Sequence, residues 1–393
     1  MNIVVIGTGM YVSGRGTDGY GTILPAIIEW VRKEVSLCKV FLVGTNGGHS
    51  REAFEKAKSL QNLTGVSLDI KTYPLGNETD PESYIKTINA IQQPACAIVA
   101  VPDHLHYKVS AACLKRGLHT LVVKPLTPTV DEAKKLIHIA GKKNLYGAVE
   151  FHKRFDKQNL MLRDIVRSGG IGSPLYCFVE YSQRKSIPTK VFKSWVNKTN
   201  ILQYLGVHYI DIIRFVTGAK PVRVMATGQK NWLKGKGIDV HDAIQSMIEW
   251  QMRDGTSFNQ TILVNWIDPE TSSAMSDQKI KLIGTAGRFE ADQKDRGITL
   301  LGDDKQIETP NPDFCRSYDL VKDNLTWQGY GIDSINTFLC DVHDIQNKKK
   351  LPKDFEGLRP TFKEALVSTS VIEAVNESLT NDSRWNEINQ SFL

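Results

Sequence analysis

Cysteine is scarce in this chain, with six residues among 393. No two cysteines form a C-x-x-C pair, and the cysteines and histidines show no combination of spacings that would suggest zinc. Zinc sites need thiolates and imidazoles at such close spacings. We therefore expect no metal site and a mostly buried, hydrophobic role for the cysteines. They are Cys38, Cys96, Cys113, Cys177, Cys315 and Cys340.

Long apolar runs and a strong charge of one sign are also missing. No stretch approaches the roughly 20 apolar residues that cross a bilayer, and the chain opens in a strand pattern rather than a signal peptide. We expect a cytoplasmic protein without a membrane partner. A net charge of +6 on 393 residues gives little support for nucleic-acid binding. With 41% hydrophobic and 23% charged residues, the chain has the composition and length of two globular domains.

The first nine residues, MNIVVIGTG, read as a buried strand that ends in glycines. A helical pattern follows over about Gly21–Glu34. Gly7 permits a tight turn and Gly9 lets a pyrophosphate approach the backbone, although Val12 stands where a third glycine is expected. This arrangement predicts the start of a dinucleotide-binding unit. Its expected cofactor contacts are Gly7, Thr8, Gly9, Met10 and Tyr11.

The second strand, Lys39–Val43, is expected to end beside the adenosine ribose. An acid there binds the 2′-hydroxyl of NAD, whereas an arginine suits the phosphate of NADP. The segment Gly44–Arg51 contains no acid. We predict NADP more readily than NAD. The expected contacts are Thr45, Asn46, Ser50 and Arg51.

Two further buried-type strands lie in Ala97–His106 and Leu121–Leu126, with a helix pattern over Tyr107–Arg116 between them. Strands that alternate with helices predict a parallel, doubly wound Rossmann sheet over residues 1–150. Lys124 precedes Pro125 at the end of its strand, where open sheets bind ligands. An ordinary basic turn is the alternative. Further expected cofactor contacts are Val101, Pro102, His106, Lys124 and Pro125. For His104 and His106 we expect a solvated or helix-capping role rather than catalysis.

Residues 151–393 show strand patterns separated by short turns, which predicts an α+β domain with a large, open, mostly antiparallel sheet. The strands are expected at Leu175–Arg184, Val222–Gln229, Ala243–Arg253, Thr256–Trp266, Gln278–Ile283 and Gly287–Ala291. Trp232, Trp250 and Trp266 are expected on the open face of this sheet. An open apolar sheet favours self-association, so a homodimer or homotetramer is expected.

Six motifs in order resemble the Gfo/Idh/MocA family, named for glucose-fructose oxidoreductase and inositol dehydrogenase. They are the glycine loop, PDHLH from Pro102, VKP at Val123–Pro125, AVEFHKRFD from Ala148, LGVHYID from Leu205, and IKLIGTAGRFEAD from Ile280. The resemblance covers nearly the whole chain. It implies hydride transfer between nicotinamide and a sugar-like carbinol or carbonyl carbon. It also implies that a helix over about 361–380 packs beside the nucleotide domain.

The resemblance further implies that Lys124 touches the reacting hydroxyl and that His208 handles the proton. Val123 replaces the glutamate that family members place before the lysine, and Tyr204 replaces the aspartate four residues before the histidine. The first change removes a charge beside Lys124, and the second removes the group that orients the imidazole. Tyr204 is then a candidate proton donor or relay, or a packing residue.

The resemblance also implies a substrate-side turn after Phe151. Candidate substrate contacts are His152, Arg154, Lys198 and Tyr204. For the three basic residues, a solvated basic surface is the alternative. The leading hypothesis is an NAD(P)-dependent oxidoreductase acting on a sugar, a cyclitol or a nucleotide-linked sugar. Two alternatives stay open: a cofactor-binding regulatory protein that has lost catalysis, and a redox-neutral epimerase or lyase that retains its nicotinamide.

Overall fold

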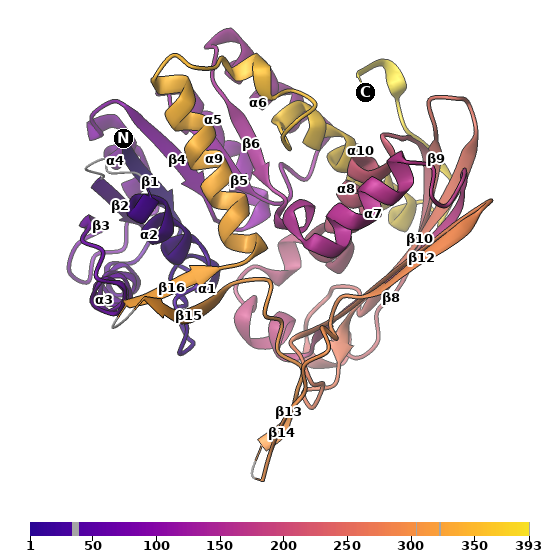
Figure 1. Ribbon diagram of the computed structural model, residues 1–393, viewed down its shortest axis with the longest axis horizontal. Helices are drawn as coiled ribbons and strands as arrows, with labels where there is room; N and C mark the ends of the chain where they lie inside the picture. The colour runs from indigo at the N-terminus through magenta and orange to yellow at the C-terminus, as the bar shows by residue number, and fades with distance from the viewer. Residues whose placement is uncertain (34–38, 304, 322–323, 393) are drawn as a thin grey trace. The chain divides into compact units, whose positions relative to one another are not determined.

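The computed structural model describes residues 1–33, 39–303, 305–321 and 324–392 (Figure 1). The expectations for Glu34 and Cys38 lie outside these residues. The chain divides into two compact units. The first contains Met1–Thr127, Asp131–Phe155 and Asp313–Ala365, and the second contains Pro128–Val130, Asp156–Pro312 and the chain from Leu366 onward.

The first unit is built on a six-stranded parallel sheet, as predicted. The strands, in spatial order, are β3 (Asp69–Tyr73), β2 (Lys39–Val43), β1 (Asn2–Ile6), β4 (Ala95–Val99), β5 (His119–Val123) and β6 (Gly147–Glu150). Strand β1 pairs with β2 on one side and β4 on the other, so the strand order reverses there. Ligands of open α/β sheets bind outside the carboxyl ends of the strands at such a point.

Amphipathic helices cover this sheet. They are α1 (Met10–Ser13), α2 (Ile23–Lys33), α3 (Gly47–Thr64), α4 (Ser83–Ala90), α5 (His106–Lys115), α6 (Val130–Lys142) and α9 (Tyr330–Gln346). The core on one face joins β1, β2 and β4 to α2, α3 and α9 (Figure 1). Ile27 of α2 and Phe338 and Leu339 of α9 are almost completely buried in it.

The two units interleave along the chain, which differs from the single boundary expected near residue 150. Residues Asp313–Ala365 group with the first unit because the apolar face of α9 completes its core. This segment also carries the hairpin of β15 (Arg316–Val321) and β16 (Asn324–Gln328). Of the last long helix, α10 (Phe362–Thr380), only the residues up to Ala365 group with the first unit.

The second unit is built on a seven-stranded mixed sheet. Its order is β12 (Gly287–Asp292), β11 (Ser276–Gly284), β7 (Pro174–Arg184), β10 (Ser257–Asp268), β9 (Ala243–Gln251), β8 (Lys220–Gln229) and β17 (Asn386–Glu387). Among the described strand pairs of this sheet, only β7 and β10 run parallel, so the sheet is mostly antiparallel, as predicted. A two-stranded arm, β13 (Leu300–Gly302) and β14 (Lys305–Glu308), extends the unit.

Helices α7 (Lys157–Arg167), α8 (Val207–Thr217) and α10 lie on one side of this sheet (Figure 1). The prediction that the tryptophans decorate its open face is wrong for Trp250 and Trp266, which are fully buried. Their indole nitrogens donate to Gln260 Oε1 at 3.0 Å and Gln183 Oε1 at 3.2 Å. A buried hydrogen-bond partner for each N–H makes a covered position favourable for these large rings.

No helix among the described residues is long and apolar enough to cross a membrane.

Candidate functional site

The turn after β1 brings the backbone into close packing at the switch point. Gly7 has a φ of +120°, and a Cβ built there would lie 2.1 Å from the carbonyl oxygen of Ala100. Only glycine fits this position. At Gly9, by contrast, a Cβ would meet no atom within 4 Å. The open space beside the Gly9 backbone fits the close approach of a pyrophosphate that the sequence predicted.

The glycine loop is longer than a simple strand-to-helix turn. A single helical turn, α1, carries Met10 and Tyr11, and Val12 of this turn is buried. The chain then forms a loop before α2 begins at Ile23. Lys56 of α3 ties this loop down by donating to the carbonyl oxygens of Thr17 and Gly19, at 2.7 and 3.0 Å.

The predicted ribose contacts that follow β2 differ in exposure and in the hydrogen bonds that they make. Asn46 caps α3 by accepting a hydrogen bond from the His49 amide, and the Ser50 hydroxyl is buried and donates to the Tyr73 carbonyl at 2.7 Å. Thr45 is exposed. Arg51 is exposed and donates to Gly76 O and Asn77 Oδ1.

A second cation reaches this edge from the glycine loop. The pKa of His49 is lowered by burial and then by the nearby charge of Arg15, while Glu52 partly opposes the shift. Arg15 therefore lies close enough to His49 for its positive charge to disfavour protonation of the imidazole. This edge carries two arginines, Arg15 and Arg51, and sequence reasoning had identified only the second.

Lys124 follows β5 directly and is buried, with 8% of its surface exposed. Burial lowers its pKa from 10.5 to about 7, and the charges of Glu150 and Asp103 act in the opposite direction. A buried amine loses the hydration that favours its charged form. At neutral pH the Lys124 amine is therefore available both as a proton donor and as a proton acceptor.

His106 holds the chain around Lys124. Its ring nitrogens face the carbonyl oxygens of Pro125 at 2.7 Å and Val101 at 2.9 Å. Burial lowers the pKa of His106, although Asp103 and these carbonyl groups oppose the shift. A neutral ring donates to only one of the two carbonyls. His106 thus connects the Val101–Pro102 segment to the Lys124–Pro125 turn.

A carboxylate that the sequence analysis did not select lies beside this turn. Glu150, the last residue of β6, is fully buried and pairs in register with Val123. His152, in the helical turn η2 (His152–Phe155), places Nδ1 3.0 and 3.2 Å from its two oxygens. In the sequence Glu150 appears only as part of the AVEFHKRFD motif, because the pairing register is not visible there.

Aromatic rings surround His152. Its ring stacks on Tyr330, with centroids 5.8 Å apart, and lies 5.2 Å from Phe314. The Tyr11 hydroxyl is 3.5 Å from Nδ1. Because Nδ1 carries at most one proton and the Glu150 oxygens are nearer, we assign the Nδ1–H bond to Glu150. Gly9, Tyr11, Lys124 and His152 thus belong to one unit, in the loops that follow β1, β5 and β6.

Tyr204 and His208 belong to the second unit. Tyr204 lies in a wide helical turn, η5 (Leu202–Gly206), and His208 is buried in the first turn of α8. The Tyr204 ring is part of an aromatic cluster with Phe192, Trp195 and Trp266, at centroid distances of 4.7, 6.3 and 6.3 Å. This packing is consistent with either expectation for Tyr204, proton donor or packing residue.

The remaining substrate-side candidates differ in exposure. Arg154 is buried and lies 3.9 Å from Glu364 as a loose ion pair, while Lys198 is exposed. Lys153, which was not among the predicted contacts, is almost completely buried. The alternative of a solvated basic turn therefore does not hold for Lys153 and Arg154.

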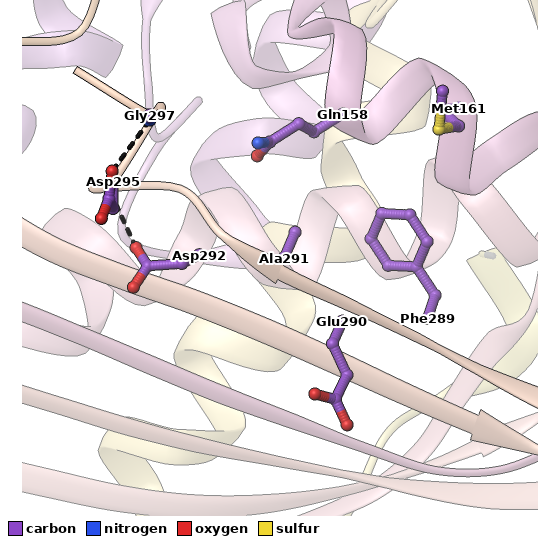
Figure 2. A pocket seen from close by; sticks show the side chains of 8 residues that line it. All are labelled: Gln158, Met161, Phe289, Glu290, Ala291, Asp292, Asp295 and Gly297. Carbon is purple, nitrogen blue, oxygen red and sulfur yellow. Dashed lines mark hydrogen bonds between the residues drawn. The ribbon is translucent and has the colours of Figure 1, made fainter.

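A surface hollow of about 570 Å³ lies in the second unit beside β12 (Figure 2). It is lined by Gln158, Met161, Phe289, Glu290, Ala291, Asp292, Asp295 and Gly297. Two of its carboxylates hold a turn, because Asp292 accepts from the Asp295 amide and Asp295 accepts from the Gly297 amide. None of the predicted site residues lines it. Among the described residues, no cluster of histidine, cysteine and acidic side chains fits a metal ion.

The fold and the glycine turn define a two-domain dinucleotide-binding protein. A model described as an oxidoreductase family with an NAD-binding Rossmann fold matches residues 37–151, and a GFO/IDH/MocA C-terminal domain model matches residues 159–290. The chain therefore belongs to the Gfo/Idh/MocA family, and the resemblance found in the sequence is confirmed.

Named relatives share only parts of the chain. The rhizopine catabolism protein MocA of Rhizobium meliloti is 28% identical over 51% of this chain and 58% of its own length. The scyllo-inositol 2-dehydrogenase (NADP(+)) IolW of Bacillus subtilis is 29% identical over 29% of this chain and 32% of its own length. The matches thus span about a third to three fifths of these relatives.

A solved structure matches over almost the full length. The scyllo-inositol dehydrogenase of Lactobacillus casei, solved with NAD(H) and scyllo-inositol, aligns with a TM-score of 0.69 and 14% identity over 98% of both chains. At this identity the likeness establishes the fold.

Proposed function

We propose that the protein is an NAD(P)-dependent oxidoreductase that moves a hydride between nicotinamide and a carbinol or carbonyl carbon of a sugar, a cyclitol or a nucleotide-linked sugar. The observation that carries this proposal is Lys124, a buried lysine at the carboxyl end of β5 with a pKa of about 7. A perturbed group at the ligand-binding edge of a parallel sheet is a candidate catalytic residue.

In this proposal each residue has a defined task. The Gly7–Tyr11 turn holds the pyrophosphate, and the bound cofactor supplies or accepts the hydride. Lys124 hydrogen-bonds the reacting oxygen, and His208 transfers the proton with help from Tyr204. The remaining proposed substrate contacts are His152, Arg154 and Lys198.

The cofactor is proposed to be NADP rather than NAD. Gly44–Arg51 offers no acid for a ribose 2′-hydroxyl, and the cations Arg15 and Arg51 reach the edge that follows β2. The name of the B. subtilis relative specifies NADP(+), which agrees, whereas the L. casei structure holds NAD(H).

A screen of free sugars, cyclitols and nucleotide sugars tests the proposal. The absorbance of the nicotinamide band should change with at least one compound and with NADPH or NADP. The two alternatives predict other results. A regulatory protein would bind cofactor without turnover, and a redox-neutral enzyme would keep its cofactor through purification.

Self-association through the second unit's sheet is also proposed, as a dimer or tetramer in the cytoplasm. Because Trp250 and Trp266 are buried, the support comes from other apolar side chains. Tyr176 and Phe178 of β7 and Met247 of β9 are exposed, 49%, 37% and 37% respectively. Phe178 pairs with Thr261, which pairs with Met247, so two of these side chains share one row across the sheet.

A further inference from the structure

We propose that Glu150 is the positioning residue of the Lys124 site and takes the place of the glutamate that family members carry before the lysine. The inference deepens the proposed function and rests on it for its effect on turnover. The expected effect of Glu150 on the pKa of Lys124 can be measured without cofactor or substrate.

The pairing register of β5 and β6 places Glu150 where its carboxylate can replace that of the family glutamate. Val123 occupies the position of the family glutamate, and Glu150 on β6 is its pairing partner. Partners in adjacent parallel strands project to the same face of a sheet. A carboxylate on β6 can therefore occupy the side of the sheet that a glutamate at position 123 would face.

Glu150 is also held in place. Its side chain is fully buried, and a buried charge is tolerated only with hydrogen-bond donors or opposite charges nearby. The His152 Nδ1–H donates to it at 3.0 Å. Glu150 also acts on Tyr11. The pKa of the Tyr11 phenol is raised first by burial, and then by the charge of Glu150 and the hydrogen bond with it.

The carboxylate acts on Lys124. Burial is the largest influence on the pKa of the Lys124 amine, and it lowers this pKa. The charge of Glu150 is the largest influence in the opposite direction, followed by the charge of Asp103 in the helical turn η1 (Asp103–Leu105). An opposite charge favours the protonated amine. Three other titratable groups interact with these two carboxylates: Asp103 acts on His106, and Glu150 acts on His152 and Tyr11. Cys315 and Tyr330 in turn act on Tyr11.

A direct test is the titration of Lys124 in the full-length protein, with ¹³Cε-labelled lysine and NMR detection. The Lys124 signal is assigned by its loss in Lys124→Met. Glu150→Gln should lower the pKa of Lys124 from about 7 by about one unit, and adding Val123→Glu to this variant should restore it. Val123→Glu alone should raise the pKa of Lys124.

Glu82→Gln is the matched control, because Glu82 is an exposed carboxylate of the same unit that pairs with Lys108 at the surface. It should leave the Lys124 titration unchanged. If Glu150→Gln does not fold, Val123→Glu alone still tests the electrostatic claim. An unchanged pKa of Lys124 in either single variant overturns the inference.

The activity measurement separates this inference from the proposed function. In an active enzyme, the limb of the kcat/KM profile that reports Lys124 should move to lower pH in Glu150→Gln and return in the double variant. A shifted titration in a protein without turnover keeps the electrostatic inference and removes the proposed function. If the enzyme turns over but neither the Lys124 titration nor the kcat/KM profile shifts in Glu150→Gln, the proposed function stands and the electrostatic inference is overturned.

Discussion

At the scale of single residues, the site depends on one buried amine. Lys124 was predictable from sequence because its signal is local: an apolar strand, a lysine and a proline within six residues. Glu150 was not selected, since its importance depends on pairing with Val123 across two strands. Ser50 was also predicted from a local pattern. Its buried hydroxyl donates to the Tyr73 carbonyl, a contact that the sequence does not show.

Burial of Lys124 should cost stability in a pH-dependent way. Its folded pKa of about 7 lies below the ordinary 10.5, so the unfolded chain binds more protons between these values. The free energy of unfolding therefore rises with pH through this window. We expect Lys124→Met to stabilise the protein by an amount on the order of a few kcal/mol at pH 7 and below, fading towards pH 10.5.

Denaturant unfolding at several pH values checks this expectation. Lys108→Met, at an exposed surface lysine, is the control and should show no comparable trend. A Lys124→Met gain that does not change with pH would refute the protonation argument.

Arg51 should decide cofactor preference. We expect NADPH to bind at least as tightly as NADH, and we expect Arg51→Ala to weaken NADPH while leaving NADH nearly unchanged. A charge-assisted contact with the 2′-phosphate is worth roughly 1.5–3 kcal/mol. Fluorescence titration of both cofactors measures this difference, and a clear preference of the unmodified protein for NADH would count against it.

At the scale of elements, most strands could be predicted from the sequence, whereas the packing of the helices was harder to predict. The predicted strand Ala243–Arg253 corresponds to β9, Ala243–Gln251, because alternating burial leaves a period of two in the sequence. No sequence pattern had assigned α9 to the first unit. Its role follows from the return of a late segment to an early core. Such long-range pairing is decided by packing between distant elements.

Helix α7 depends on one carboxylate. Asp156 caps it by accepting from the Gln158 amide, and it also binds Arg296 with contacts of 2.6 and 3.0 Å. Both side chains are buried. We expect Asp156→Ala to destabilise the second unit by about 3–5 kcal/mol, because it removes the cap and leaves a buried guanidinium without its partner.

Thermal or denaturant unfolding measures this cost. Asp131→Ala removes an exposed carboxylate that pairs with Lys135 and should cost less than about 1 kcal/mol. Equal costs for the two variants would show that the buried pair contributes little.

At the scale of the whole molecule, the open sheet face predicts assembly. We expect light scattering to show a dimer or tetramer rather than a 44.0 kDa particle at micromolar concentration. Phe178→Glu should shift the protein towards monomer, because a charge in the middle of an apolar contact loses its hydration. Leu75→Glu, at an exposed loop residue of the first unit, is the control. A monomeric unmodified protein would contradict the proposal.

The central claim is that Lys124 hydrogen-bonds the reacting oxygen and His208 transfers the proton in a nicotinamide-dependent reaction. The most direct test is the turnover of Lys124→Ala, His208→Ala and Tyr204→Phe, followed at the nicotinamide band with the substrate that the screen identifies. We expect the first two variants to lose roughly 10²- to 10⁴-fold in turnover while NADPH affinity is nearly intact, and Tyr204→Phe to lose less. Full activity in all three variants would contradict the placement of the site. Near-normal His208→Ala with inactive Tyr204→Phe would instead identify the tyrosine as the principal acid.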